Sequence, residues 1–355
     1  MRRIRIVLLT LPILVLIVIM MLTGCSSGKA ADQPTGSGES IDNPVTPSAL
    51  LAEDTAEPST EPSTEPSSDS SFDESTFPVA TDWTVVSDIS ITHPTNIAGF
   101  LNENYGLTVG YDGEIHYTND GGKTWPRAQN SSMCRFCLDI VDENLAWSGG
   151  NGNNVRVTED GGKIWRAVTD ADLGGKHSNI DFVDGTTGWL VSQTNCSVTK
   201  DGGATWTPLA LPVNLKNIAS ICLRTASDGY ILSNSGLFFE TTDGGTTWNE
   251  QDLGFKDYGI VDQKNQPGLY KNIIALSDIS FTDEKNGTIV FTGPIPGQGV
   301  KTWCLTTADG GATWTSELIP ATEEFAPAKV FLSGDGKYLT LGSSNANRFI
   351  VMKRE

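Results

Sequence analysis

One octapeptide occurs five times in this chain of 355 residues and constrains the fold more than any other feature. The copies share the pattern Thr-x-Asp-Gly-Gly-x-Thr/Ile-Trp, with aspartates spaced 40, 41, 42 and 66 residues apart. A fixed period of this size is typical of repeat proteins, in which each repeat is one supersecondary unit. The repeated residues are Asp120, Asp160, Asp201, Asp243 and Asp309, with Trp125, Trp165, Trp206, Trp248 and Trp314.

The octapeptide predicts a tight turn between two β-strands. An aspartate can accept hydrogen bonds from backbone N–H groups just ahead of it, and the two glycines permit positive φ. The flanking Thr and Trp favour extended chain. Because buried aromatic rings dominate core energetics, we expect the tryptophans to anchor packing and the aspartates to shape turns, rather than to bind a ligand.

Each octapeptide comes after three short apolar runs, and a fourth run starts at its tryptophan. Four short strands in a repeat of about 40 residues indicate a β-propeller blade. The chain ends with three such runs that lack an octapeptide and a fourth strand, while Asp82-Trp83 resembles the end of an octapeptide and the strand that begins there. We therefore expect the segment 82–86 to complete the last blade and close the ring.

The predicted fold is an all-β, six-bladed propeller of four-stranded antiparallel blades over residues 81–355. A seven-bladed ring is the alternative, if the longer interval between Trp248 and Trp314 contains a degenerate blade. In each blade the first-to-second and third-to-fourth turns should share one face, here called the bottom face. The second-to-third turns and the connections between blades should share the opposite one, the top face.

Residues 1–25 have the composition of a targeting segment. Three arginines precede an apolar run from Ile6 to Leu22, which is followed by Thr-Gly-Cys25. This boundary resembles a bacterial lipobox. The resemblance implies cleavage before Cys25, acylation of that cysteine, and a position on the outer leaflet of the bacterial cytoplasmic membrane. An uncleaved transmembrane anchor is the alternative, because the run approaches bilayer-spanning length.

Residues 26–80 form a linker rich in Pro, Ser, Thr and Glu, with 11 acidic side chains and one basic side chain. Such a composition cannot bury enough apolar surface to fold, so we expect a disordered tether. Residues 81–355 carry 32 acidic and 20 basic side chains, a net charge of −12. That balance argues against nucleic acid as a partner, since nucleic-acid binding needs a basic footprint.

The octapeptide resembles the Asp-box, also called the bacterial neuraminidase repeat. The fuller repeat, with its apolar strands ahead of the octapeptide, is similar to that of the photosystem II assembly and stability factor-like propellers. The resemblance covers about residues 82–355 and implies the propeller fold. It implies several functions, because Asp-boxes occur in sialidases, xyloglucan hydrolases, sortilin-type receptors and non-catalytic assembly factors.

No catalytic residue, metal site or cofactor is predicted. A sialidase-like site needs an arginine cluster, a Tyr–Glu pair and usually an Arg-Ile-Pro motif, which is absent here. The three histidines, His93, His116 and His177, are isolated in the sequence. No Cys/His spacing fits zinc. A glycosidase with two carboxylates stays open, because such a pair is formed in space rather than in sequence.

The cysteines predict structural roles. Cys134 and Cys137 form a C-x-x-C that we expect to be a local disulfide, with free thiols as the alternative. Cys196 and Cys304 share one repeat position and are expected to be separate buried thiols.

The top face is the expected binding surface, because function on rigid scaffolds usually lies in loops. The connection 249–275 is unusually long, and the loop 292–300 is extended above the same blade. Amide side chains beside aromatic rings suit recognition of a glycan or a peptide. The candidate binding residues are Phe255, Tyr258, Tyr270, Asn151, Asn153, Asn154 and Asn195; plugging the channel or covering a blade edge is the alternative role for these loops.

The sequence therefore favours a lipid-anchored, extracytoplasmic, non-catalytic propeller that binds a protein or a glycan of the cell envelope. A role as an assembly or stability factor of a membrane complex is one form of this hypothesis. A glycoside hydrolase of sialidase-like or xyloglucanase-like type is the alternative.

Overall fold

The computed structural model describes residues 78–110, 112–129, 136–168, 173–192, 195–215, 217–253, 276–295, 299–319, 327–343 and 347–355. These residues form strands and turns, and no helix among them could cross a membrane. The strands are β1 (Trp83–Ser90), β2 (Ile97–Phe100), β3 (Gly106–Val109), β4 (Ile115–Thr118), β5 (Cys137–Ile140), β6 (Ala146–Gly149), β7 (Val155–Thr158), β8 (Arg166–Ala167), β9 (His177–Phe182), β10 (Gly188–Ser192), β11 (Asn195–Thr199), β12 (Thr207–Pro208), β13 (Ile218–Leu223), β14 (Gly229–Ser233), β15 (Phe238–Thr241), β16 (Asn249–Gln251), β17 (Leu276–Phe281), β18 (Gly287–Ile295), β19 (Gly299–Thr307), β20 (Thr315–Leu318), β21 (Pro327–Leu332), β22 (Tyr338–Ser343) and β23 (Arg348–Arg354).

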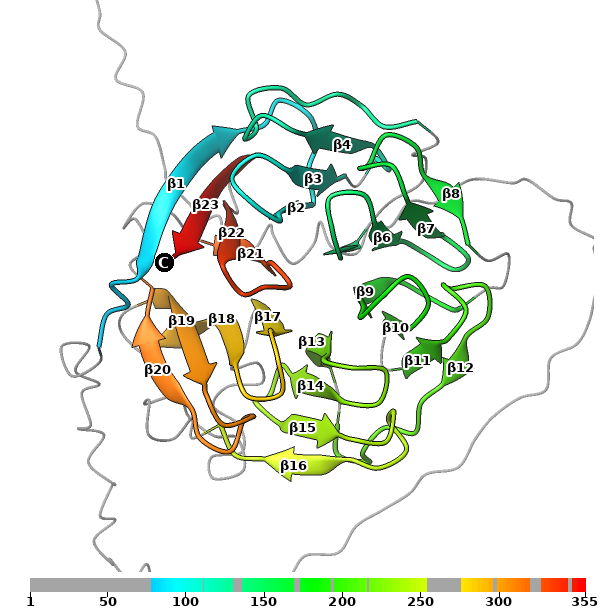
Figure 1. The fold of residues 1–355 in the computed structure, drawn as a ribbon, viewed down its shortest axis with the longest axis vertical. Coiled ribbons are helices and arrows are strands. Elements are labelled where there is room, and N and C mark those ends of the chain that lie inside the picture. The colour runs from blue at the N-terminus through cyan, green and yellow to red at the C-terminus, as the bar shows by residue number, and fades with distance from the viewer. Residues whose placement is uncertain are drawn as a thin grey trace, which may run out of the picture. The chain divides into compact units, whose positions relative to one another are not determined.

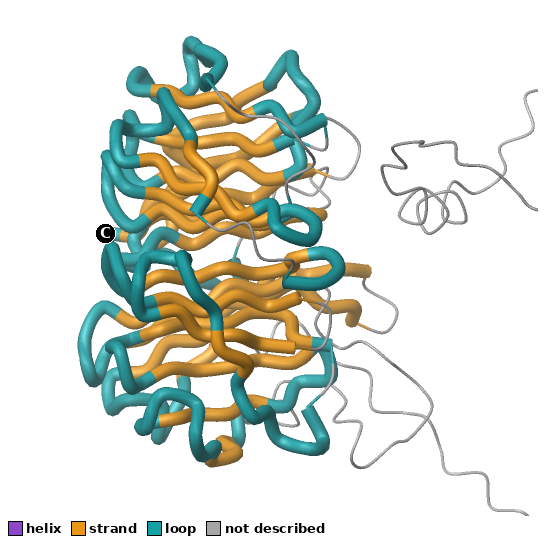
Figure 2. Tube along the Cα trace, turned by 90° about the vertical axis from the view of Figure 1, so that its right-hand side faces the viewer, coloured by secondary structure: helices purple, strands orange, loops and turns teal. Residues whose placement is uncertain are grey.

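The strands form six antiparallel sheets, arranged as blades around a central axis (Figure 1). The innermost strands are β2, β5, β9, β13, β17 and β21, in chain order around the ring. Loops and turns lie at the two ends of the strands, which gives the propeller its two faces (Figure 2). The six-bladed prediction is confirmed, and the seven-bladed alternative is wrong.

The N-terminal strand closes the ring, as the sequence predicts. β1 pairs with β23 from Trp83↔Arg354 to Ser90↔Arg348, so the last blade takes its outer strand from the start of the propeller. Figure 1 shows the two strands side by side. Asp88 accepts two hydrogen bonds from the Arg348 guanidinium, at 2.9 and 2.6 Å. Without β1, the last blade would expose an unpaired strand edge.

The first blade departs from the four-stranded expectation. Its sheet has three strands, and one bridge between His116 and Arg127 stands where a fourth strand was expected. Pro126 comes directly after the octapeptide and has no N–H to donate to a ladder. The chain then leaves toward the second blade, where Gln129 forms a bridge with Ile164. The segment 127–129 therefore pairs first with the third strand of the first blade and then with the second blade.

The fifth blade carries a long hairpin where the sequence predicts a loop over 292–300. β18 and β19 stay paired as far as Ile295↔Gly299. Pro294 is tolerated because β17 pairs with β18 only as far as Thr292, so no third strand needs its missing N–H. The hairpin therefore continues past the end of the blade sheet as a two-stranded ribbon.

Aromatic side chains fill the seams between the blades. The Trp147 ring of the second blade stacks on Phe182 of the third, with centroids 3.8 Å apart. Tyr230 of the fourth blade stacks on Phe281 of the fifth at 4.2 Å. Stacked pairs of this kind add to the stabilisation that comes from the area they bury. The apolar core of the propeller therefore lies between neighbouring blades, in several clusters rather than one central cluster.

Candidate functional site

The polar groups of the octapeptide turns form hydrogen bonds within the turns themselves. In the first turn, Asp120 Oδ1 accepts hydrogen bonds from Thr118 Oγ1 at 2.8 Å and from Thr124 N at 3.0 Å. Asp120 Oδ2 accepts one from Thr124 Oγ1 at 2.6 Å. Three other turns, those of Asp201, Asp243 and Asp309, repeat these contacts.

In these four turns the hydrogen bonds lower the pKa of the aspartate and keep it ionised. The hydroxyl of Thr124 is the main cause that lowers the pKa of Asp120 to about 2, and Thr247 does the same for Asp243. A carboxylate with so low a pKa holds no proton to donate near neutral pH. The aspartates of these four turns therefore serve as hydrogen-bond acceptors rather than general acids.

The two glycines of each octapeptide attach it to the rest of its blade. Gly121 and Gly122 have φ of 72° and 84°, in the left-handed region that favours glycine. The N–H of Gly121 donates to Asn104 O in the first-to-second turn, at 3.0 Å. The other four octapeptide turns make the same contact in their own blades, so the two kinds of bottom-face turn are bonded to each other.

The repeated tryptophans lie against the scaffold. Trp165 is fully buried, whereas the other four are partly exposed. The indole N–H of Trp125 donates to Gly122 O at 3.0 Å, and Trp165, Trp206 and Trp314 do the same in their own turns. Trp248 differs, because its N–H donates to Ala210 O. None of the five indole N–H groups is left for a ligand.

The second turn lacks one contact because Ile164 stands where the other four copies have threonine. Asp160 Oδ1 still accepts from Ile164 N at 3.0 Å, but there is no hydroxyl at position 164 to donate to the second carboxylate oxygen. Ile164 is 48% exposed. An isoleucine at this position leaves apolar surface in water without gaining the bond that threonine makes.

We expect Ile164→Thr to stabilise the propeller, raising Tm by about 2 °C, because it adds the missing hydroxyl donor to a preformed turn. Differential scanning calorimetry measures the change. Thr124→Ile in the first turn is the matched control and should lower Tm by a similar amount. Equal Tm values for both variants and the wild type would contradict this account of the turn.

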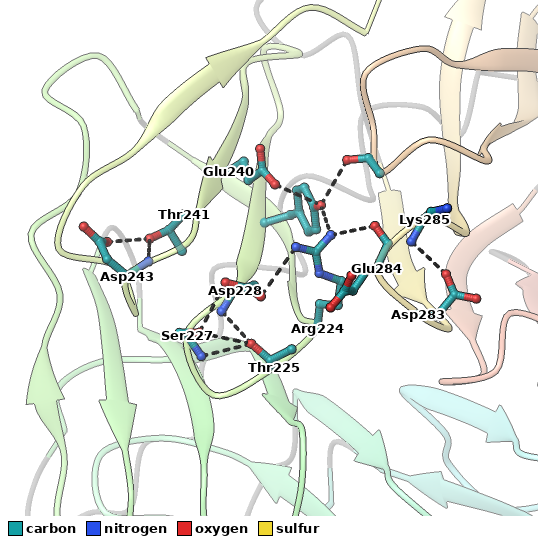
Figure 3. Close-up of polar contacts among 12 residues, drawn as sticks. Arg224, Thr225, Ser227, Asp228, Glu240, Thr241, Asp243, Asp283, Glu284 and Lys285 are labelled. Atoms are coloured by element: carbon teal, nitrogen blue, oxygen red, sulfur yellow. Dashed lines mark hydrogen bonds and ion pairs between the residues drawn. The ribbon is translucent and has the colours of Figure 1, made fainter.

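A partly buried polar network joins the fourth and fifth blades on the bottom face (Figure 3). Arg224 Nη1 donates to Tyr230 Oη at 3.0 Å and to Glu284 O of the fifth blade at 3.1 Å. Tyr230 in turn donates to Glu240 Oε1 at 3.2 Å. Asp228 lies 3.5 Å from Arg224 Nη2. The chain that connects these two blades is long, and this network joins the blades directly through hydrogen bonds.

The same network contains a Tyr–Glu pair beside an arginine, the residue types of a sialidase-like site. Tyr230 is only 1% exposed, however, and burial raises its pKa further above the ordinary tyrosine range. A nucleophilic tyrosine needs a substrate within reach and an accessible ionised form. Tyr230 has neither, so the Tyr–Glu pair helps to hold the two blades together.

The top face presents some of the predicted amides. Asn151 and Asn153 are exposed in the second-to-third turn of the second blade, and Asn195 is exposed at the start of β11. Asn154 was expected beside them but is only 2% exposed. It closes the turn, with its N–H donating to Asn151 O at 3.0 Å. Phe255, Tyr258, Tyr270, Cys25 and Cys134 lie outside the described residues, so the predictions for them stay predictions.

The exposed amides stand on a rigid base. The turn at Asn151 bridges Lys176 in the connection to the third blade, and Gly152 N donates to Gly175 O at 2.9 Å. The Lys176 ammonium lies 4.3 Å from the centroid of the Phe136 ring. Amide groups, an ammonium group and an aromatic ring thus gather at the junction of the second and third blades.

Two histidines that are isolated in the sequence meet on the first blade. The rings of His93 and His116 stack with centroids 3.6 Å apart. His93 Nε2 lies 2.9 Å from Thr108 Oγ1. Burial lowers the pKa of His93 to about 4 and also lowers the pKa of His116. Both imidazoles are therefore neutral near neutral pH.

Other chemical candidates have structural surroundings. Cys196 and Cys304 are separate buried thiols, as predicted, and burial raises the pKa of each. No group of three or more His, Cys, Asp or Glu side chains suited to a metal occurs within the described ranges. The sequence did not single out three aspartates on the innermost strands, Asp139, Asp181 and Asp278, although all three stand in an apolar run.

No protein-family model and no curated protein matches the chain. Among solved structures, the RRP9 WD40 repeats align with a TM-score of 0.51 and 12% identity, over 79% of this chain and 99% of that one. A structure of YCF48 bound to D1 peptide aligns at 0.48 and 16%, over 79% and 98%. An ancestral GH74 enzyme aligns at 0.46 and 13%, over 75% of this chain and 37% of that one. At 12% identity the likeness to the RRP9 repeats is one of fold, and it agrees with the propeller described above.

Proposed function

We propose that this protein is a membrane-anchored, extracytoplasmic propeller that binds a protein or glycan of the cell envelope with its top face and catalyses no reaction. The observation that carries the proposal is the contrast between the two faces. The bottom-face turns direct their carboxylates, glycine N–H groups and indoles into the scaffold. The top face presents Asn151, Asn153 and Asn195 to solvent.

The chemistry of the top face suits recognition. An amide group offers both a donor and an acceptor, and an aromatic ring beside it offers an apolar contact. The backbone of the turn at Asn151 is fixed by its bridge to Lys176, so little loop entropy would be lost on binding. The long connection 254–275, with Tyr258 and Tyr270, is proposed to extend this surface.

The N-terminal segment gives the proposal its location. The lipobox-like boundary at Cys25 supports a lipid anchor, and the linker 26–80 supports a tether that holds the propeller away from the membrane. The octapeptide is proposed to be an Asp-box. The similarity of its repeat to assembly and stability factor-like propellers supports a role in maintaining a membrane complex as the specific form of the binding function.

Replacing Asn151, Asn153 and Asn195 together with alanine should weaken retention of the envelope partner by roughly tenfold or more, because truncating an amide leaves its partner groups unpaired in the interface. The measurement is quantitative mass spectrometry of proteins and glycans that co-purify from detergent-solubilised membranes. A bottom-face variant, Lys123→Ala with Lys163→Ala, is the matched control and should retain the partner. Equal loss in both variants, or no loss in either, contradicts a top-face site, whereas release of reducing sugar or sialic acid from a glycan panel would favour the hydrolase.

A further inference from the structure

Asparagines recur at the second-to-third turns of three successive blades on the top face. Asn151 and Asn153 lie between β6 and β7, Asn195 is the first residue of β11, and the half-buried Asn234 lies between β14 and β15. The exposed Asn217, just ahead of β13, belongs with them, because its carbonyl oxygen accepts from Asn234 N at 2.8 Å. Figure 1 shows these three blades one after another around the ring. The five asparagines are here called the amide arc.

The backbone beneath the amide arc is held in place. Asn217 has a φ of 52°, in the left-handed region, and it is the one described residue other than glycine with a positive φ. Such backbone costs energy, persists where the surrounding structure holds it, and is concentrated at functional sites. In the adjoining turn, Ser233 Oγ lies 2.9 Å from Ser235 Oγ and accepts from Leu237 N at 3.0 Å. A ligand would therefore meet amides on a preorganised base, which lowers the entropy lost on binding.

The side-chain amides of the arc are available to a ligand. Within the part of the chain that the structure describes, none of the five forms a side-chain hydrogen bond. Each amide group has an oxygen that accepts and an NH₂ group that donates twice. A ligand that satisfies both must itself offer donors and acceptors close together. Because the amides recur from blade to blade, a chain molecule with such groups on every unit fits the arc.

The amide arc is a neutral area on an acidic domain, which has a net charge of −12 over residues 81–355. The corresponding turn of the first blade has Asp112 and Glu114, and the bottom-face Asn119 adjoins the ionised Asp120. Among the described residues of the arc and its connections, Lys176 is the single lysine, arginine, aspartate or glutamate; these residues are 149–154, 173–178, 195–196, 209–215, 217 and 233–237. A polyanion would be repelled by the domain, and a polycation would find no carboxylate here, so an uncharged ligand fits best.

The arc lacks the features by which proteins usually bind peptides. Those features are a free sheet edge, an apolar groove for a helix, an aromatic groove for a proline-rich segment and a cluster of arginines. The described part of the arc offers the tips of turns, one ammonium group and the ring of Phe136, which that ammonium already contacts at 4.3 Å. The hydroxyl groups of a sugar need none of these features, because each can donate to and accept from an amide. The arrangement therefore favours a glycan over a peptide.

We propose that the amide arc binds an uncharged glycan chain, with successive sugar units on the turns of the second, third and fourth blades. The inference rests on the top-face function proposed above and names its ligand. Several turns act on one chain, so affinity rises with the number of sugar units. Because the ligand has no charge, salt has little effect on the affinity.

Isothermal titration calorimetry of the full chain tests the ligand class, in a detergent without a sugar headgroup. The probes are glucose, mannose, galactose and N-acetylglucosamine, each as the monomer and as the β-1,4-linked hexamer, with a galacturonate hexamer as the charged counterpart. We expect at least one neutral hexamer to bind, its monomer to bind at least tenfold more weakly, and high salt to leave the affinity unchanged. Failure of every neutral hexamer to bind, or tighter binding of the galacturonate hexamer, overturns the proposal.

Asn217→Gly with Asn234→Ala tests the place of binding. Glycine keeps the left-handed backbone while removing the amide, so the variant should fold and melt like the wild type. We expect its affinity for the neutral hexamer to fall roughly tenfold, because two hydrogen-bonding side chains are lost. Asn119→Ala removes an exposed asparagine from the bottom face and is the matched control, which should bind as the wild type does. Wild-type affinity in the double variant overturns the arc.

Co-purification from solubilised membranes with the same double variant separates a failure of this inference from a failure of the proposed function. If no neutral hexamer binds but the variant loses a co-purifying protein, the glycan is wrong and the top-face function stands. If no neutral hexamer binds and the variant keeps every partner of the wild type, both are contradicted. Loss of a co-purifying glycan together with weaker hexamer binding supports both.

Discussion

Deleting residues 80–90 should abolish the folded propeller. β1 is the outer strand of the last blade, and its removal exposes the edge of β23 and the apolar side chains packed beneath it. Trp83 and Ile89 are 4% and 6% exposed, and each should contribute about 1.5–3 kcal/mol by burial. Their combined loss approaches the total stability of a typical domain, about 5–15 kcal/mol. Circular dichroism and size-exclusion chromatography should show an unfolded or aggregated chain.

Two point variants test whether the packing of β1 into the last blade stabilises the ring, without removing any residues. Trp83 packs in one cluster with Val290 and Cys304 of the fifth blade and with Leu339 of the last, so Trp83→Ala should cost about 3–5 kcal/mol. Val85→Ala, two residues further along the same strand, should cost almost nothing because Val85 is 52% exposed. A deletion variant that melts like the wild type would show that the ring does not depend on its N-terminal strand.

Replacing Cys25 with serine should abolish incorporation of a fatty-acid label. Serine lacks the thiol that the lipobox-like boundary supplies for acylation. The wild-type protein should take up labelled palmitate and should have an intact mass that excludes residues 1–24. Palmitate labelling in a bacterial expression host, with mass spectrometry of the purified protein, measures both effects. We expect complete loss of the label in the variant.

Intact mass also decides between the two interpretations of the N-terminal segment. An uncleaved transmembrane anchor would keep residues 1–24 in the wild-type protein, and neither it nor the variant would carry label. A wild-type mass that includes these residues would therefore contradict the lipid anchor. The propeller should melt at the same temperature in both proteins, because the segment lies outside the described fold.

The fold could be predicted from the sequence because its information is local and repeated. Each octapeptide contains the acceptor, the two glycines and the aromatic residue that one turn requires, so five copies in phase specify five blades. Closure could be predicted because the segment that starts at Trp83 resembles the segment that starts at the last residue of each octapeptide. The departures have local causes as well: Pro126 interrupts the outer strand of the first blade. Gly and Pro in 292–300 suggested a loop because a sequence does not show that β18 extends beyond β17, which leaves the edge of β18 that faces β17 unpaired there.

The site residues were harder to predict because they are brought together by packing between distant segments. His93 follows β1 and His116 lies on β4, so their rings are brought together by the packing of the first blade against the closing strand. Asp139 and Phe182 belong to different blades, and the bond between them depends on the arrangement of the seams. Asn154 was placed with Asn151 and Asn153 because all three fall in one second-to-third turn, and that turn buries Asn154.

Hydrogen–deuterium exchange of the propeller, with and without the envelope partner that co-purifies with it, tests the central claim most directly. The claim is that the bottom face is scaffold and the top face binds. We expect slower exchange on binding in the second-to-third turns at 149–154 and 192–195 and in the connection 254–275, with the five octapeptide turns unchanged. Slower exchange in the octapeptide turns, with the top face unchanged, would contradict the account.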